Sequence, residues 1–442
     1  MEALGIFGLL AGIALMIILA YRGWNAVPLT LIAGLVICIL NGIGIWEGIT
    51  SWATGLGGTF TSYFMLFFLS TCFANVMEAT GACTAIANRF ISWFGKKHIL
   101  TVLSLFVFIL CYGGVSFFVC MFAVGPITMK LFKELNVPRP LAIIPLAVGG
   151  GAWVYAIPGS TQLSNVIPTS LGTTLMAAPV MGFGAVAAGM IVSLIIAERI
   201  YKKQMQLVAE GKIEGFTGDD NMVVDERSEL PSTVCAFLPM VVLIAFIMIC
   251  SFAKLITNGT LLACLAMFIA SVVCFVINIK FISGNKIEVL KSIMAKGATG
   301  AAGSALTLGA VVGFGTLVSS TAAFQNIVDW LMGLNISIYW KGIISTGVIS
   351  GVAGSASSGT RLTVQYLGDY FVSSGCNLDV LHRLIALASI TFDSLPHCTG
   401  CFLMFSYLGL NHKNAYKYTF LFDTVITVIA VLICTIIASV MY

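Results

Sequence analysis

Long, uninterrupted apolar runs constrain this chain more than any other feature of its sequence. A helix needs roughly 20 apolar residues to cross a hydrocarbon core about 30 Å thick. Runs of this kind recur at residues 4–20, 26–44, 178–197, 235–252, 260–279 and 419–441. Only 9% of the 442 residues are charged, whereas soluble domains carry roughly 25%. The sequence therefore predicts an all-α integral membrane protein, with about a dozen membrane helices once the less regular runs are included.

The basic residues indicate how the chain is oriented. Arg199, Lys202 and Lys203 follow a strong apolar run and open the only long polar segment of the sequence. Because loops rich in Lys and Arg stay on the cytoplasmic side, we expect this segment to be cytoplasmic and the protein to lie in the cell (inner) membrane. The net charge of +4 is too small and too dispersed to indicate nucleic acid as a partner. The predicted domains are an N-terminal membrane repeat at 1–197, a cytoplasmic linker at 198–232 and a C-terminal membrane repeat at 233–442.

Residues of the same type recur at a constant distance in the two halves. Gly113 and Gly351 are as far apart in the chain as Pro158 and Pro396 are. Constant spacing of this kind is typical of an internal repeat. Many transporters consist of two repeats with opposite orientations in the membrane, so the sequence predicts two inverted repeats.

Each half contains an apolar stretch that is too long for one span. Residues 99–129 would form an unbroken helix of about 45 Å, which exceeds the hydrocarbon core. Paired glycines have little helix propensity, so we expect a break at YGGVS, Tyr112–Ser116. In the second half, residues 342–372 contain GSASSGT at Gly354–Thr360. Both stretches are predicted to be re-entrant hairpins.

A proline interrupts the segment after each hairpin. Residues 140–165 are apolar up to Pro158 and Gly159, and residues 378–400 are interrupted by TFDSLPHCTG. Proline removes a backbone donor and clashes with the preceding turn. Non-helical backbone inside a membrane is tolerated only where protein or water satisfies it, so these paired interruptions predict a binding site at mid-membrane. The alternative is a set of proline kinks whose Ser and Thr side chains bond to the preceding turn.

Few ionisable residues lie near these interruptions. Asp393 and His397 are four positions apart, and both are candidates for carrying a coupled proton, because burial favours a neutral carboxyl group and histidine titrates near neutral pH. The alternative is a structural Asp–His hydrogen bond that holds the broken helix. Arg361 follows the serine-rich break and is placed either to bind a carboxylate or to extend to the membrane interface.

The sequence contains no pattern that indicates an enzyme or a metal site. HCTGC, residues 397–401, includes two cysteines but lacks the further ligands of a structural zinc site. No nucleotide-binding loop or metalloprotease helix is present. We therefore expect neither a metal nor another cofactor, and no enzymatic activity.

One short motif resembles a known family. DSLPH, Asp393–His397, is similar to the Asp-x-x-Pro-His signature of the gluconate permease (GntP) family, which belongs to the ion transporter superfamily, and the layout of hairpins and breaks is similar over nearly the whole chain. The resemblance implies a homodimeric symporter that moves gluconate or a related hydroxy or keto acid together with protons by an elevator-type mechanism. The motif is followed here by Cys398-Thr399-Gly400 and not by the Asn-Gly pair often found in the family. A smaller acid, such as a hydroxybutyrate or a short dicarboxylate, is therefore an alternative substrate.

The resemblance assigns the substrate site to the hairpin tips and the breaks. The expected substrate-binding residues are Gly113, Gly114, Ser116, Pro158, Gly159, Ser160, Thr161, Ser355, Ser357, Ser358, Gly359, Thr360, Arg361, Ser394 and Thr399. The expected proton-coupling residues are Asp393 and His397.

Three other functions are compatible with parts of this pattern. A sodium-coupled carboxylate transporter is the nearest, because unwound carbonyls and hydroxyl oxygens also bind sodium. A membrane-embedded enzyme would use His397 and Cys398, but the sequence supplies no oriented base for the thiol. An ion channel would need an open filter, whereas two symmetric hairpins favour alternating access.

Overall fold

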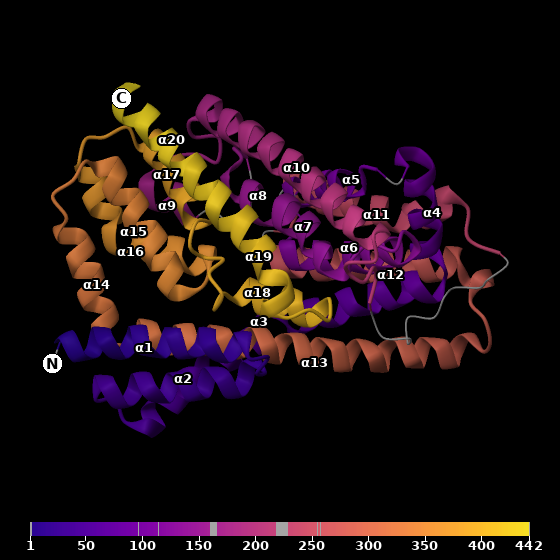
Figure 1. The fold of residues 1–442 in the computed structure, drawn as a ribbon, viewed down its shortest axis with the longest axis horizontal. Coiled ribbons are helices and arrows are strands. Elements are labelled where there is room, and N and C mark those ends of the chain that lie inside the picture. The colour runs from indigo at the N-terminus through magenta and orange to yellow at the C-terminus, as the bar shows by residue number, and fades with distance from the viewer. Residues whose placement is uncertain are drawn as a thin grey trace. The chain divides into compact units, whose positions relative to one another are not determined.

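The computed structural model describes residues 2–95, 97–113, 115–159, 166–217, 229–253, 255–256 and 258–441. These residues form helices and short connections, with no β-strand among them (Figure 1). Helices satisfy their backbone hydrogen bonds internally, which is what a chain in lipid requires. The predicted all-α class is confirmed.

Seven helices among the described residues are long and apolar enough to cross a membrane. They are α1 (Glu2–Tyr21), α3 (Ile45–Ala79), α10 (Pro179–Ala209), α11 (Thr233–Phe252), α12 (Gly259–Ile277), α13 (Lys286–Ser319) and the continuous run of α19 (His412–Thr419), η4 (Phe420–Val425) and α20 (Ile426–Met441). Counting α4 (Ala82–Phe94) and α5 (Ile99–Tyr112) as one bent span gives eight. The multi-pass architecture is confirmed, with fewer full-length helices than the dozen expected, because other apolar runs form shorter helices.

The shorter helices lie on either side of the predicted breaks. They are α2 (Ala26–Asn41), α6 (Phe117–Glu134), η1 (Arg139–Ala142), α7 (Ile143–Leu146), η2 (Ala147–Ala152), α8 (Trp153–Ala156), α9 (Val166–Leu171), η3 (Ile279–Phe281), α14 (Ala322–Gly333), α15 (Ile338–Ala353), α16 (Ala356–Ser373), α17 (Leu378–Ser389) and α18 (Thr399–Tyr407). Among them, η2 is a π-helical turn, as is η4 in the run that ends with α20.

All four predicted interruptions are present. The first hairpin turns between Tyr112 and Phe117, and the second turns at Gly354 and Ser355. Helix α8 ends just before Pro158, and α17 and α18 are separated by residues 390–398. The second turn is shorter than predicted: α16 already includes Ser357–Thr360, because Ser355 caps the helix ahead of them. Whether the hairpins re-enter the membrane stays a prediction.

The order and lengths of the helices recur along the chain. Helices α1 and α11 have 20 residues each, α3 and α13 have 35 and 34, and α6 and α16 have 18 each. The elements between them follow in the same order, from α4 and α5 in the first half to α14 and α15 in the second. This order supports an internal repeat, and the inverted orientation of its halves stays a prediction.

The described chain divides into two compact units. Unit 1 consists of residues 1–60, 151–193 and 306–442, and unit 2 consists of 61–150 and 194–305. Each unit thus combines segments from both halves of the sequence. A sequence repeat need not form a compact unit of its own, so the compact units do not test the predicted repeats. The predicted domain boundaries at 197 and 233 stay a prediction.

Close backbone contact holds the segments of α3 and α13 that belong to unit 1. A Cβ at Gly313 would collide with the backbone oxygen of Trp52, and a Cβ at Gly55 would lie 2.7 Å from the Cα of Gly313. Trp52 Nε1 donates to the carbonyl of Ala310 at 3.0 Å and is 3.2 Å from Thr30 Oγ1. Small residues at helix crossings permit this approach in membrane proteins.

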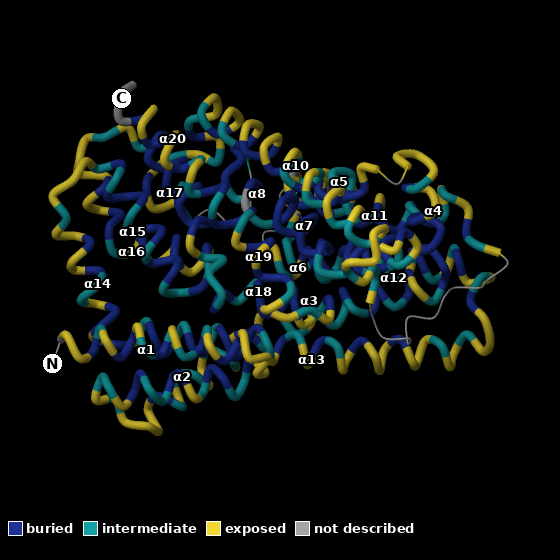
Figure 2. The backbone as a smooth tube through the Cα atoms, viewed as in Figure 1, coloured by how far each residue is buried: buried dark blue, intermediate teal, exposed yellow. Residues whose placement is uncertain are grey.

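Helix α17 forms part of the core of unit 1. Every residue from Val380 to Ser389 is buried, and Figure 2 shows this segment in the colour of buried chain. Asn377 caps the helix by accepting the N–H groups of Asp379 and Val380. Because α17 is buried on all sides, it holds the start of the interruption at 390–398 in a fixed position within unit 1.

Candidate functional site

The turn between α15 and α16 brings backbone and hydroxyl groups to one place in unit 1. Gly354 has a φ of +61°, in the left-handed region that favours glycine. A Cβ on it would lie 3.4 Å from atoms of His397 and Cys398. Ser355 Oγ accepts the N–H of Ser358 at 3.4 Å and so caps α16.

The break between α17 and α18 contacts this turn directly. The backbone N–H of Thr399 donates to the Gly354 carbonyl at 3.1 Å, and Thr399 Oγ1 donates to the same oxygen at 3.3 Å. The Nε2 atom of buried His397 lies 2.7 Å from the Gly351 carbonyl. A carbonyl only accepts, so Nε2 carries the proton of this bond. The structure therefore joins the two predicted motifs of the second half.

Asp393 occupies the N-terminus of α16. Its carboxylate accepts the backbone N–H groups of Ala356 and Ser394, and Ser394 Oγ donates to it at 3.0 Å. Ala356 is the first residue of α16, where unpaired N–H groups and the helix dipole favour negative charge. Since His397 bonds to Gly351 and not to Asp393, the alternative of a structural Asp–His hydrogen bond is wrong.

The first turn of α16 presents polar side chains on one face. Ser357, Ser358 and Arg361 are exposed, and residues three and four positions apart share a face of a helix. Thr360 is buried, and its hydroxyl has no hydrogen-bond partner among the described residues. Gly359 is packed so closely on α15 that a Cβ there would collide with Ser350, so its contribution is to the packing of the hairpin.

The remaining predicted residues lie at the other two interruptions. In unit 2, Gly113 is the C-cap of α5, and Ser116 Oγ accepts the N–H of Val119 at 3.4 Å. In unit 1, Pro158 and Gly159 follow α8, and the Gly159 N–H donates to the Leu175 carbonyl at 2.9 Å. The predicted residues Gly114, Ser160 and Thr161 lie outside the described residues.

Arg383 on α17 is a buried cation that the sequence analysis missed. Its guanidinium donates to the carbonyls of Ala156 at 2.9 Å, Leu175 at 3.1 Å and Ala177 at 2.7 Å. The neighbouring His382 Nδ1 lies 2.7 Å from Thr173 Oγ1. Arg383 thus ties the end of α8 and the loop at 175–177 to α17. The signal for it was a basic pair, HR, within the apolar residues 380–388.

Asp423 is a second buried carboxylate that the sequence analysis missed. It lies in the π-helical turn η4 with 3% of its surface exposed. A Cβ on Gly151, in the π-helical turn η2, would be 2.8 Å from Asp423 Oδ1, so the carboxylate lies directly against a glycine backbone. The signal was a lone acidic residue within a membrane-length apolar run.

Comparison with known proteins decides the family. A sequence model described as "GntP family permease" matches residues 4–441. The chain belongs to the GntP family of permeases. A relative named "Uncharacterized transporter YxjC", from Bacillus subtilis strain 168, is 27% identical over 92% of this chain and 93% of its own length. The resemblance in the DSLPH motif is thereby confirmed, and the protein is a multi-pass transporter of the cell membrane and not an enzyme.

Two further relatives of the permease align over about half of each chain. The high-affinity gluconate transporter of Escherichia coli K12 is 23% identical over 53% of this chain and 52% of its own. An uncharacterized permease of Haemophilus influenzae is 24% identical over 55% of this chain and 50% of its own.

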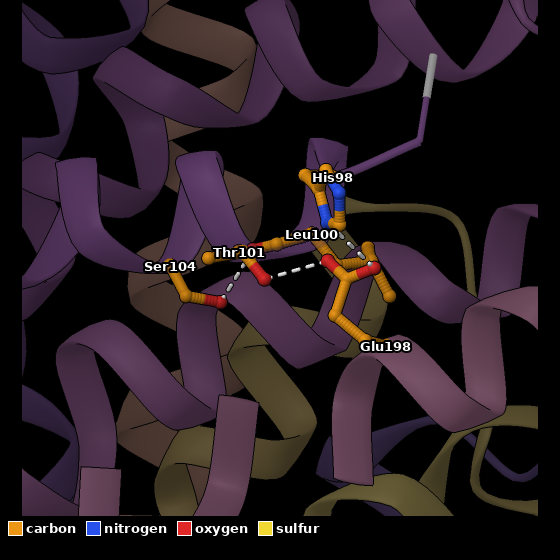
Figure 3. A network of polar contacts seen from close by, with 5 residues as sticks. All are labelled: His98, Leu100, Thr101, Ser104 and Glu198. Carbon is orange, nitrogen blue, oxygen red and sulfur yellow. Dashed lines mark hydrogen bonds and ion pairs between the residues drawn. The ribbon is translucent and has the colours of Figure 1, made fainter. Parts of the chain in front are cut away.

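The permease has a separate polar network in unit 2 (Figure 3). Glu198 on α10 accepts a hydrogen bond from Thr101 Oγ1 at 2.5 Å, and its other oxygen lies 3.3 Å from His98 Nδ1. A cavity of about 320 Å³ lies beside it, lined by Thr101, Leu194, Ile195, Glu198, Arg199 and Lys202. The network joins the start of α5 to α10 and includes no predicted site residue.

Cysteine pairs in the permease have structural contacts. Cys398 Sγ accepts the N–H of Cys401 at 3.2 Å and so caps α18. Within the described ranges, no group of three or more His, Cys, Asp or Glu side chains is arranged to hold a metal ion.

Proposed function

We propose that this permease is a secondary active symporter that moves a small organic anion, such as gluconate or a related hydroxy or keto acid, together with protons. The observation that carries the proposal is the contact of the Asp393–Thr399 break with the start of α16. This contact gathers a helix N-terminus, hydroxyl groups and a carboxylate in one place. The gluconate transporter among the relatives supports the substrate class.

Arg361, Ser357 and Ser358 form the proposed anion-binding face of α16. All three are exposed, and Arg361 lies three and four positions after the two serines. Guanidinium binds a carboxylate through two parallel hydrogen bonds, and the two hydroxyl groups are donors for the hydroxyl oxygens of a sugar acid. The face thus has complementary groups for both parts of a hydroxy acid.

Uptake into proteoliposomes tests this function. We expect purified protein to accumulate radiolabelled gluconate when the outside is more acidic than the inside, with or without sodium. Accumulation that requires sodium and ignores the pH gradient would contradict proton coupling. If gluconate is not accumulated, thermal-shift measurements with hydroxybutyrates and short dicarboxylates identify the acid, because a ligand at 100 times its dissociation constant adds about 2.7 kcal/mol of stability.

We also propose a homodimer with elevator-type alternating access, as the family resemblance implies. Division of the chain into two compact units supports a mechanism in which one body moves against another. Light scattering of the detergent-solubilised protein tests the dimer, and a monomeric mass would contradict it.

A further inference from the structure

Asp423 is buried within a helical run that is long and apolar enough to cross the membrane. The run His412–Ala438 contains no other Asp or Glu. An ionised side chain in the middle of a bilayer costs at least about 2.5 kcal/mol, and such residues face protein or water and mark pathways for ions and protons. The burial of Asp423 within such a run makes it a candidate for a proton pathway.

The backbone around Asp423 is unusual. A π-helical turn, η4, carries the residue between α19 and α20, and such turns occur frequently at functional sites. The hydroxyls of Thr419 and Thr424, one on each side of Asp423, are buried and have no hydrogen-bond partner among the described residues. Thr427 Oγ1 donates to the backbone carbonyl of Asp423. Three polar side chains at 419, 423 and 424 are thus held inside unit 1 without being used for helix capping.

The surroundings of Asp423 link it to the break described above. It belongs to the same helical run as Tyr416 and His412 of α19, and both of these side chains contact the break. Tyr416 donates to the carbonyl of Ser394 at 3.2 Å. His412, also on α19, is bonded to the carbonyl of Pro396, and the segment η2 contributes only glycine and small apolar residues. Asp423 and two side chains that contact the break are thus carried by one continuous helical run.

Asp393, in contrast, has a positioning role. Three donors converge on its carboxylate from Ala356 and Ser394. A proton on an oxygen of Asp393 would remove an acceptor from this set, and would loosen the contact between the break and α16.

We propose that Asp423 carries the proton that is coupled to substrate movement, while Asp393 positions the break on α16. The carboxylate takes up a proton from the side of higher proton concentration and becomes a neutral carboxyl group. After Asp423 has become accessible from the other side of the membrane, the proton leaves to that side and the carboxylate is restored. The inference rests on the proposed function as a proton symporter.

The test compares net accumulation with exchange in proteoliposomes. Radiolabelled gluconate is supplied either with an inward pH gradient, or in exchange for unlabelled gluconate inside, which requires no net proton movement. We expect Asp423→Asn to lose gradient-driven accumulation and the proton influx that accompanies it, measured with a pH-sensitive dye, while it retains exchange. Asp369→Asn, at an exposed position of α16, is the matched control and should behave as the wild type.

A second variant tests the proposal in case Asp423→Asn does not fold. Gly151→Ala places a methyl group against the carboxylate, and we expect a shift in the pH dependence of accumulation with exchange retained.

Normal accumulation by Asp423→Asn overturns the proposal, as does loss of exchange in a variant with wild-type thermal stability. If the wild type neither accumulates nor exchanges gluconate or any other acid found by the thermal-shift measurements, the proposed function fails and this inference with it. If the wild type exchanges gluconate but accumulates it only with sodium, the proton assignment fails alone.

Discussion

Asp393 and His397 stand four positions apart, yet their side chains bond to different helices. His397 bonds to Gly351 at the end of α15, and Asp393 bonds to Ala356 at the start of α16. At the residue scale, the two ionisable side chains of the DSLPH motif therefore each fix one side of the hairpin turn. The motif is a docking element between two interrupted helices.

Replacing Asp393 tests this role. Asp393→Asn removes the charge from the N-terminus of α16, and we expect a loss of about 1–2 kcal/mol of stability, the usual effect of a lost helix cap with its dipole interaction. Thermal unfolding in detergent measures it. Asp369→Asn, which removes an exposed carboxylate from the same helix, should leave the melting temperature unchanged, and equal melting temperatures for both variants would contradict the capping role.

Arg361 is the side chain that we expect to hold the substrate carboxylate. Arg361→Gln removes a charge-assisted hydrogen bond worth about 1.5–3 kcal/mol, so the dissociation constant for the anion should rise about 10- to 100-fold. Ligand-induced thermal shifts measure this constant. Gln365→Ala, one turn further along the exposed face of α16, is the control, and an unchanged constant for Arg361→Gln would remove Arg361 from the site.

For Arg383 we expect an effect on stability and not on substrate affinity, because its donors bond to backbone carbonyls. Arg383→Met removes the donors that the guanidinium gives to the carbonyls of Ala156 and Ala177, while the Leu175 carbonyl keeps the Gly159 N–H. We expect a loss of about 3 kcal/mol. Size-exclusion chromatography after heating measures the loss. A melting temperature equal to that of Arg361→Gln, in which an exposed arginine is removed, would show that the carbonyls find other partners.

At the scale of elements, the interruptions were the most predictable feature. Pairs of glycines and a proline in apolar surroundings lower helix propensity whatever the tertiary structure, so all four breaks could be placed from the sequence. The extent of the second turn could not, because Ser355 caps α16 early and draws Ser357–Thr360 into the helix. The π-helical turns at 147–152 and 420–425 were not predicted, since one extra residue in a uniformly apolar helix changes no hydrophobic period. Asp423 was missed although the sequence carries a signal for it, a lone acidic residue in a long apolar run.

Two glycines with similar backbone conformations allow the effect of backbone strain to be told apart from that of steric crowding. Gly354 and Gly375 both have positive φ, +61° and +73°, so alanine at either position costs about 1 kcal/mol or more of strain. A Cβ at Gly375 meets open space, whereas at Gly354 it meets His397 and Cys398. We therefore expect Gly354→Ala to impair gluconate exchange and Gly375→Ala to leave it intact at a similar melting temperature. Equal exchange rates would show that the turn tolerates displacement of the break.

At the scale of the whole molecule, orientation in the membrane is the property to test. In a cysteine-free background, Lys203→Cys should react with a membrane-impermeant maleimide in inside-out vesicles and not in intact spheroplasts, because Arg199, Lys202 and Lys203 predict a cytoplasmic position. Labelling only in spheroplasts would reverse the orientation. The background has to be free of cysteine because the chain contains 13 of them.

The carbonyl of Gly354 receives both hydrogen bonds of Thr399, from the backbone and from the side chain. Because the two bonds share one acceptor, a rotation of the Gly354 peptide would break both of them at once. We therefore expect the hairpin turn and the start of α18 to separate or to stay joined as a pair whenever that peptide changes its orientation.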